Sequence, residues 1–109
     1  MSKTVMIVQP TTWMKPREIQ KERTRIAKAL MRKGYIVLNA KWEGRNISNN
    51  SSSKLFMLGN DVQKLGLADC VLFCDEWRDD AGCCALHYIC TKYKKNTMTE
   101  EDIFTEDYS

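Results

Sequence analysis

The feature that most constrains the fold is an alternation between short, unbroken apolar runs and longer segments with helical spacing. The apolar runs are Val5–Val8, Tyr35–Leu38 and Cys70–Cys74, and a shorter fourth strand is expected at residues 97–99. Unbroken runs of this length are typical of strands that are buried on both faces of a parallel sheet. Strands that alternate with helices form β-α-β units, whose right-handed crossovers place helices on both faces. The sequence therefore predicts an α/β fold with an open, mostly parallel sheet of three or four strands.

Three segments between these runs have the apolar spacing of amphipathic helices. They are expected at residues 15–33, from Leu55 to about Gly66, and from about Gly82 to Lys94. Pro16 is tolerated in the first turn of a helix, and Gly34 stands where a helix C-cap belongs. Leu55, Leu58, Val62 and Leu65 lie at i, i+3, i+7 and i+10, which places them on one face of a helix. The acidic tail, residues 100–109, is expected to be peripheral or frayed.

Length and composition indicate one soluble globular domain. The chain has 109 residues, of which 43% are hydrophobic and 28% charged, which is enough apolar material for one core. No signal peptide is recognisable, and no window approaches the run of about 18 apolar residues that a membrane span needs. We therefore expect a cytoplasmic location and no membrane partner.

The five cysteines are expected to be reduced. Their number is odd, and Cys70, Cys74, Cys84 and Cys90 stand among apolar residues, so buried thiols acting as small hydrophobic side chains are the expected state. A metal site is not expected, because the chain has no C-x-x-C pair and His87 is its single histidine. No cofactor is predicted either, because neither G-x-G-x-x-G nor G-x-x-x-x-G-K-[ST] occurs.

The basic residues gather in the first half of the chain. Residues 1–45 hold eleven Lys and Arg against three Asp and Glu, and residues 46–109 hold six against eleven. Four of the basic side chains, at positions 21, 25, 28 and 32, follow helical spacing. No aromatic residue is interleaved with them, so a solvated helix face is expected rather than a nucleic-acid surface.

Polar residues after the strands mark the expected ligand crevice. In open parallel sheets this crevice lies beyond the carboxyl ends of the strands, which here groups Gln9–Trp13, Asn39–Trp42 and Asp75–Gly82. Acidic side chains dominate the candidates near that mouth, namely Asp61, Asp75, Glu76, Asp79 and Asp80. Paired carboxylates suit glycosyl transfer, which needs an acid and a nucleophile or stabilising anion. The alternative is that these acids are solvated loop and helix-cap residues.

The order of these features resembles the nucleoside 2-deoxyribosyltransferase-like superfamily, especially its short phage and bacterial members of unknown function. Along the chain, the matching segments are Val5 to Pro10, Lys33 to Asn39, Asn60-Asp61, Leu67 to Phe73, Asp75 to Trp77 and Asp80 to His87. The resemblance covers about residues 3–99. It implies a three-layer α/β domain of the flavodoxin or Rossmann type over residues 1–99, followed by the tail.

The resemblance also implies cleavage of an N-glycosidic bond in a nucleoside or nucleotide. Asp61 in the Asn-Asp helix motif and Asp80 in the acidic loop become the candidate catalytic residues. Gln9-Pro10 matches the turn that faces sugar and base, where many members have Gly-Pro. The nucleophilic glutamate of the family falls on Leu86, which can neither attack a carbon nor hold a proton.

Other side chains are candidates for contacting the substrate. The predicted substrate-binding residues are Gln9, Pro10, Trp13, Trp77, Asp79, Gly82 and Leu86. Trp13, Trp42 or Trp77 would stack on a base, although packing is the alternative for each. His87, Asp79 or Glu76 could replace the missing nucleophile or base, but Leu86 itself has the spacing of a core residue.

Three functions remain open at this point. The leading hypothesis is a protein that binds a nucleoside or nucleotide and lacks the parent transferase reaction. The second is an active N-glycoside hydrolase or deoxyribosyltransferase that uses another carboxylate. The third is a protein-interaction module with a vestigial pocket. The resemblance further implies a homo-oligomer, and a phage-encoded member would act in the cytoplasm of its host.

Overall fold

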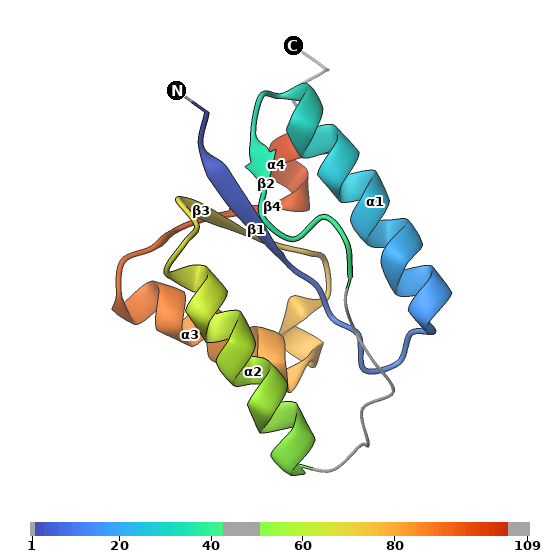
Figure 1. Cartoon of the computed structure of the whole chain (residues 1–109), viewed down its shortest axis with the longest axis vertical. Coiled ribbons are helices and arrows are strands. Elements are labelled where there is room, and N and C mark those ends of the chain that lie inside the picture. The colour runs from blue at the N-terminus through green and yellow to red at the C-terminus, as the bar shows by residue number, and fades with distance from the viewer. Residues whose placement is uncertain (1, 43–50, 105–109) are drawn as a thin grey trace.

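The computed structural model describes residues 2–42 and 51–104. These residues form one four-stranded, all-parallel sheet in the order β2-β1-β3-β4, with helices on both faces (Figure 1). The elements are β1 (Thr4–Val8), α1 (Pro16–Arg32), β2 (Ile36–Val37), α2 (Ser51–Leu65), β3 (Cys70–Phe73), the 3₁₀ turn η1 (Trp77–Asp79), α3 (Ala81–Lys92), β4 (Asn96–Thr99) and α4 (Glu100–Phe104). The predicted fold class is confirmed, including the short fourth strand.

The two central strands separate two apolar layers. β1 and β3 pair in register from Val5 opposite Cys70 to Val8 opposite Phe73, and successive side chains of a strand point to opposite faces. The layer under α1 and α4 contains Val5, Ile7, Ile26, Leu30, Cys70, Leu72 and Ile103. The layer under α2 and α3 contains Met6, Val8, Leu65, Val71, Phe73, Cys83, Leu86 and Cys90. Both faces of β1 and β3 are buried, as their unbroken apolar runs predict.

The prediction of a buried strand at Tyr35–Leu38 is wrong in length and burial. β2 has two residues at the edge of the sheet, and Ile36 is 55% exposed. The β-ladder between β2 and β1 ends early because the side chain of Asn39, and not its backbone, makes the next hydrogen bonds to β1. Its Oδ1 accepts the Ile7 N–H at 2.8 Å, and its Nδ2 donates to the Ile7 carbonyl at 2.9 Å.

Helix boundaries follow the predicted end signals. α1 ends before Gly34, whose φ of 92° lies in the left-handed region that glycine adopts without strain. The Tyr35 N–H then bonds back to the Leu30 carbonyl at 3.1 Å, which is the closing bond of a Schellman cap. The apolar stripe predicted on α2 lies on a helix as expected, but Leu55 is exposed and only Leu65 of that stripe is fully buried.

The end of the described chain is not a peripheral tail. Residues 100–104 form α4, in which Glu100 and Ile103 are buried, so the expectation of a frayed segment is wrong there; residues 105–109 lie outside the described residues. The Asp102 carboxylate accepts the Thr99 N–H at 2.7 Å, which closes the first turn as a capping box does. None of the described helices has the length and apolar character needed to cross a membrane.

The cysteines match the prediction with one exception. All five thiols are free, and Cys70, Cys74, Cys83 and Cys90 are buried, whereas Cys84 is exposed. The prediction for Cys84 is wrong because α3 turns its neighbour Cys83 toward the sheet instead. Burial raises the pKa of the Cys74 and Cys83 thiols, so these two groups stay protonated and act as apolar side chains.

Candidate functional site

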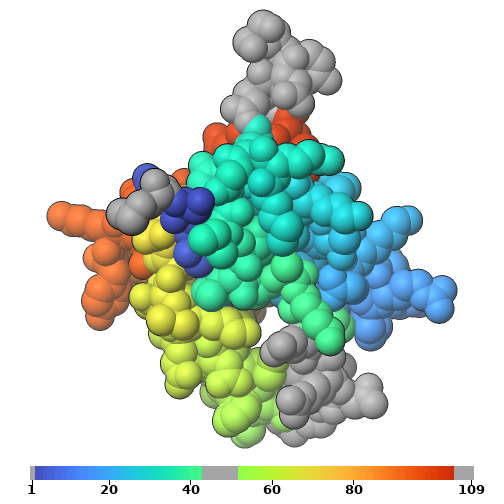
Figure 2. All heavy atoms as spheres, turned by 45° about the horizontal axis from the view of Figure 1, so that its top comes forward, coloured from blue at the N-terminus to red at the C-terminus, as the bar shows by residue number. Residues whose placement is uncertain are grey.

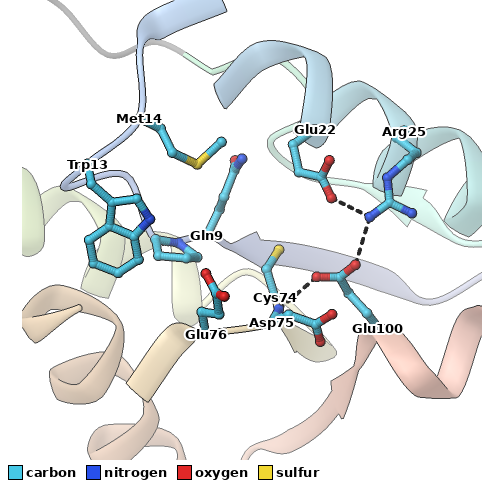
Figure 3. A pocket seen from close by; sticks show the side chains of 10 residues that line it. Gln9, Trp13, Met14, Glu22, Arg25, Cys74, Asp75, Glu76 and Glu100 are labelled. Atoms are coloured by element: carbon cyan, nitrogen blue, oxygen red, sulfur yellow. Dashed lines mark hydrogen bonds and ion pairs between the residues drawn. The ribbon is translucent and has the colours of Figure 1, made fainter. Parts of the chain in front are cut away.

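A pocket opens at the carboxyl ends of the two central strands, β1 and β3. The strand order places β2 on one side of β1 and β3 on the other, so the β1–β3 boundary is the topological switch point at which α/β sheets bind ligands. The pocket has a volume of about 210 Å³ (Figure 3). Its lining residues are Gln9, Pro10, Trp13, Met14, Glu22, Arg25, Cys74, Asp75, Glu76 and Glu100.

The pocket is small for a complete ligand. Drug-sized ligands occupy pockets of roughly 300–1,000 Å³, so about 210 Å³ accommodates one ring, with the rest of the molecule outside. Gln9 and Pro10 follow β1, and Cys74 and Asp75 follow β3, which fixes the floor on the two most buried strands. The site is therefore built on rigid elements.

Gln9 is a wall of the pocket, and both ends of its side-chain amide are bonded within the protein. Its Nε2 donates to the Ile19 carbonyl at 3.0 Å, and its Oε1 accepts from Nε of Arg23 at 3.0 Å. Both side chains are buried. Burial lowers the pKa of Arg23, but a guanidinium stays charged in proteins. Arg23 thus holds Gln9 in place and also lies 3.5 Å from the Asn39 carbonyl.

Arg23 is a residue that the sequence reasoning missed. Its signal was present, because a charged residue stands on the apolar stripe of α1 between Ile19 and Ile26. A charge at a core position points to a polar partner at the same depth. Here that partner is Gln9, across the base of the pocket.

A buried carboxylate ties the last helix to the pocket. Oε1 of Glu100 accepts from Arg25 at 2.8 Å, and its Oε2 accepts the Asp75 backbone N–H at 2.7 Å. Arg25 also donates to Glu22 on its own helix, and the hydrogen bond to Glu22, followed by that to Glu100, raises the pKa of Arg25. α4 therefore fixes the loop that follows β3, as Figure 3 shows.

Two further acids at the pocket have unused side chains. The carboxylates of Asp75 and Glu76 have no hydrogen bond or ion pair to another described residue. Glu76 has a φ of 67°, a left-handed conformation that a side chain with a Cβ adopts only at an energetic cost. Trp13 is 52% exposed and lies at the same rim (Figure 3). Four carboxylates and one guanidinium line the pocket, so it favours neutral or cationic groups over anions.

Asp80 does not line the pocket; it joins the loop after β1 to α3. Its Oδ1 accepts the Cys83 N–H at 3.0 Å as the N-cap, and its Oδ2 accepts from the Thr12 hydroxyl at 2.8 Å and the Thr11 N–H at 3.3 Å. Burial alone would raise the pKa of Asp80, but these hydrogen bonds hold that pKa below its ordinary value.

Asp61 lies on α2 and is also outside the lining of the pocket. It is half-buried, and this burial raises the pKa of its carboxyl, while Lys64 and then Arg23 act in the opposite direction. The structure thus places the two candidate catalytic acids on different helices of the α2–α3 layer, with Asp80 engaged as a cap.

Leu86 is buried in the apolar layer beneath α2 and α3. The position that the resemblance assigns to the nucleophile therefore carries a hydrocarbon side chain inside the core. Gly82 lies in the first turn of α3, where an added Cβ would stand 3.3 Å from Oδ1 of Asp80. Asp79 is exposed in η1 and does not reach the pocket.

Of the three tryptophans, Trp13 alone lines the pocket. The ring of Trp77 stacks on His87, with centroids 4.1 Å apart and planes 19° from parallel, and it also contacts Phe73 at 5.4 Å. That stack uses both Trp77 and His87 for packing. Trp42 is half-buried, and its backbone N–H donates to Gln20 at 2.7 Å.

Comparison with models of protein families and with curated proteins finds no match to this chain. The described residues contain no group of three acidic, histidine or cysteine side chains arranged to hold a metal ion. Of the predicted substrate-binding residues, the pocket unites Gln9, Pro10 and Trp13. The lining side chains of α1 and α4, and Met14, were missed, because their approach depends on how the helices pack.

Proposed function

We propose that this chain binds a nucleoside in the pocket between the ends of β1 and β3, and that it lacks the transferase reaction of the superfamily it resembles. The observation that carries the proposal is the position of the pocket at the topological switch point of a parallel sheet. Ligands of open α/β sheets bind at this place because the loops there diverge.

The lining chemistry supports a nucleoside. The exposed indole of Trp13 offers a face for stacking on a base. The free carboxylates of Asp75 and Glu76 accept hydrogen bonds from sugar hydroxyls or base amino groups, as acidic residues do for the ribose in dinucleotide sites. The same carboxylates oppose a phosphate, so the proposal favours an unphosphorylated nucleoside over a nucleotide.

The position of Leu86 supports binding without turnover. Glycosyl transfer needs a carboxylate that attacks or stabilises the anomeric carbon, and Leu86 in the core supplies none. Glu100, the most buried acid of the pocket, already accepts from Arg25 and from the Asp75 N–H. The resemblance also implies self-association, and the proposal includes a homo-oligomer that acts in the cytoplasm.

The test is a thermal-shift and calorimetric titration with the common ribo- and deoxyribonucleosides and their 5′-monophosphates. A ligand at 100 times its dissociation constant stabilises a protein by about 2.7 kcal/mol. We expect a nucleoside to stabilise the fold and its monophosphate to do so less. Trp13→Ala and Glu76→Gln should each weaken binding, whereas Asp79→Asn, an exposed acid of the same loop outside the pocket, serves as the matched control.

Product analysis of the same mixtures separates the other functions. Release of free base by the wild-type protein, lost in a pocket variant, would show an active N-glycoside hydrolase or transferase. A panel in which no nucleoside or nucleotide stabilises the fold would refute the proposal and leave the interaction module as the remaining function.

A further inference from the structure

Among residues 2–42 and 51–104, no segment covers one complete face of helix α2. The exposed residues on this face and in the turn that follows, here called the α2 face, are Ser52, Leu55, Phe56, Gly59, Val62, Gln63, Gly66 and Leu67. They recur at intervals of three, four and seven, which places them on one side of the helix. In Figure 1, α2 lies at the front of the molecule with no other helix over it, and Figure 2 shows its last turns and the following segment, yellow-green to yellow, at the surface.

The α2 face carries no charged residue, and four of its eight residues are large apolar side chains. Leu55, Phe56 and Leu67 are 66%, 72% and 70% exposed, and Val62 is 37% exposed. Contiguous apolar patches are uncommon on monomeric proteins, and depletion of charged residues is the mark of an interface core. By contrast, the exposed ring of Tyr88 has a charge beside it, because the Lys92 ammonium lies 5.4 Å from the ring centre.

Large and small residues alternate along the middle of the face. Leu55, Gly59, Val62 and Gly66 follow one another at i, i+4, i+7 and i+11. This order is self-complementary when the helix is reversed. In an antiparallel pair of α2 helices, Leu55 of each copy lies opposite Gly66 of the other, and Val62 lies opposite Gly59. Such a two-fold contact uses the same patch twice, as isologous interfaces do.

No contact with another described residue explains the glycine at position 59. A glycine in a helix interior destabilises the helix relative to alanine, and an added Cβ at Gly59 would meet no atom within 4 Å. Among the described glycines, Gly34 has a positive φ and Gly59 does not, so backbone conformation does not require a glycine at position 59. A close approach of a second backbone is a reason for glycine that the monomer does not supply.

We propose that the chain forms a two-fold homodimer through antiparallel contact of the two α2 faces. The interface has a second copy as its occupant because the face matches itself in both polarity and shape. Fifteen residues of helix extend about 22 Å, and one helix pair of this length buries less than the roughly 800 Å² per partner of standard interfaces. The dimer is therefore reversible and dissociates on dilution.

Sedimentation of the full-length protein tests this interface. Protein concentrations from roughly 1 μM to 1 mM cover the dissociation constants of weak complexes. The weight-average mass of the wild type should rise from 12.7 kDa toward twice that value. Gly59→Lys places two like charges at the contact, and it should weaken dimerisation at least about tenfold. Circular dichroism checks the fold, which the substitution spares because the site is open in the monomer.

Two further variants fix the surface and the orientation. Met31→Lys puts the same charge on an exposed apolar residue of α1, and it should dimerise like the wild type. Adding Val62→Glu to Gly59→Lys brings opposite charges together across an antiparallel pair, and it should restore dimerisation. A monomeric wild type, an unaffected Gly59→Lys or an equal loss in Met31→Lys would overturn the proposal, and failure of the double variant would overturn the antiparallel register.

Discussion

Removing the Asp80 carboxylate is expected to weaken the fold itself, because this side chain is a structural junction. It accepts from the Cys83 N–H, the Thr12 hydroxyl and the Thr11 N–H at 3.0, 2.8 and 3.3 Å. Loss of an N-cap acceptor costs about 1 kcal/mol, and a hydrogen bond to a charged group contributes about 1.5–3 kcal/mol. The long Thr11 contact adds little. We therefore expect Asp80→Ala to lower the free energy of unfolding by about 3 kcal/mol.

Asp80→Asn refines this expectation. Asparagine is as good an N-cap as aspartate, so the bond from Cys83 survives. An amide nitrogen in place of Oδ2 accepts neither from the Thr12 hydroxyl nor from the Thr11 N–H. The loss should be about half that of the alanine variant. Urea unfolding of both variants at neutral pH measures the difference, with Asp79→Asn as the control, since Asp79 is exposed and carries no such junction.

The pH dependence provides a second check. Hydrogen bonds hold the pKa of Asp80 below its ordinary value of 3.8 in the folded protein, so the unfolded chain binds the proton more readily. This stabilisation is complete above the unfolded pKa and is lost as the pH falls through the folded pKa. The difference in free energy of unfolding between the wild type and Asp80→Asn should therefore shrink as the solution becomes acidic. An Asp80→Ala variant as stable as the Asp79→Asn control would refute the structural role and leave Asp80 free for a ligand.

Three other substitutions test neighbouring parts of the account. Leu86→Glu restores the carboxylate of the resembled family but buries it without a partner, at a cost of about 3–5 kcal/mol; near-ultraviolet circular dichroism should show an unfolded protein, and a folded, active variant would contradict this. Glu76→Gly relieves a left-handed residue at φ 67° and should add about 1 kcal/mol of stability while weakening nucleoside binding; a lower melting temperature or unchanged binding would count against both roles. Burial raises the pKa of Asp61, so its ionised form opposes folding, and Asp61→Asn should match or exceed wild-type stability at neutral pH. As the pH falls toward 4, the free energy of unfolding of the wild type should rise relative to that of Asp61→Asn. The opposite trend in urea unfolding would show that folding stabilises the ionised carboxylate instead.

The sheet could be predicted where burial determines the residue pattern. Val5–Val8 and Cys70–Phe73 are covered on both faces, and their unbroken apolar runs predict this burial. Ile36 is equally apolar but lies on an edge strand, and a local pattern does not distinguish a central strand from an edge. The segment 100–104 was misjudged because its acids suggested solvent, although Thr99 and Asp102 carry the spacing of a capping box.

The candidate site was predictable in its location and less so in its members. The rule that ligands bind beyond the strand ends selected Gln9, Pro10 and Trp13, which follow β1 directly. Glu22 and Glu100 come from helices whose packing angles decide what they reach, and no local spacing encodes that. Asp80 looked like a sugar ligand, but an acid just before a helix has the pattern of an N-cap, and the structure shows that use.

Binding of a nucleoside between β1 and β3 is the central claim, and amide and indole shift mapping by NMR tests it most directly. Adding adenosine, guanosine, cytidine, uridine and thymidine in turn to the ¹⁵N-labelled protein should, for at least one of them, move the Trp13 indole signal and the amides of Gln9, Asp75 and Glu76 together. Those residues line the pocket from both strands. Shifts that gather around Asp61 instead, or no shifts with any of the five, would contradict the account.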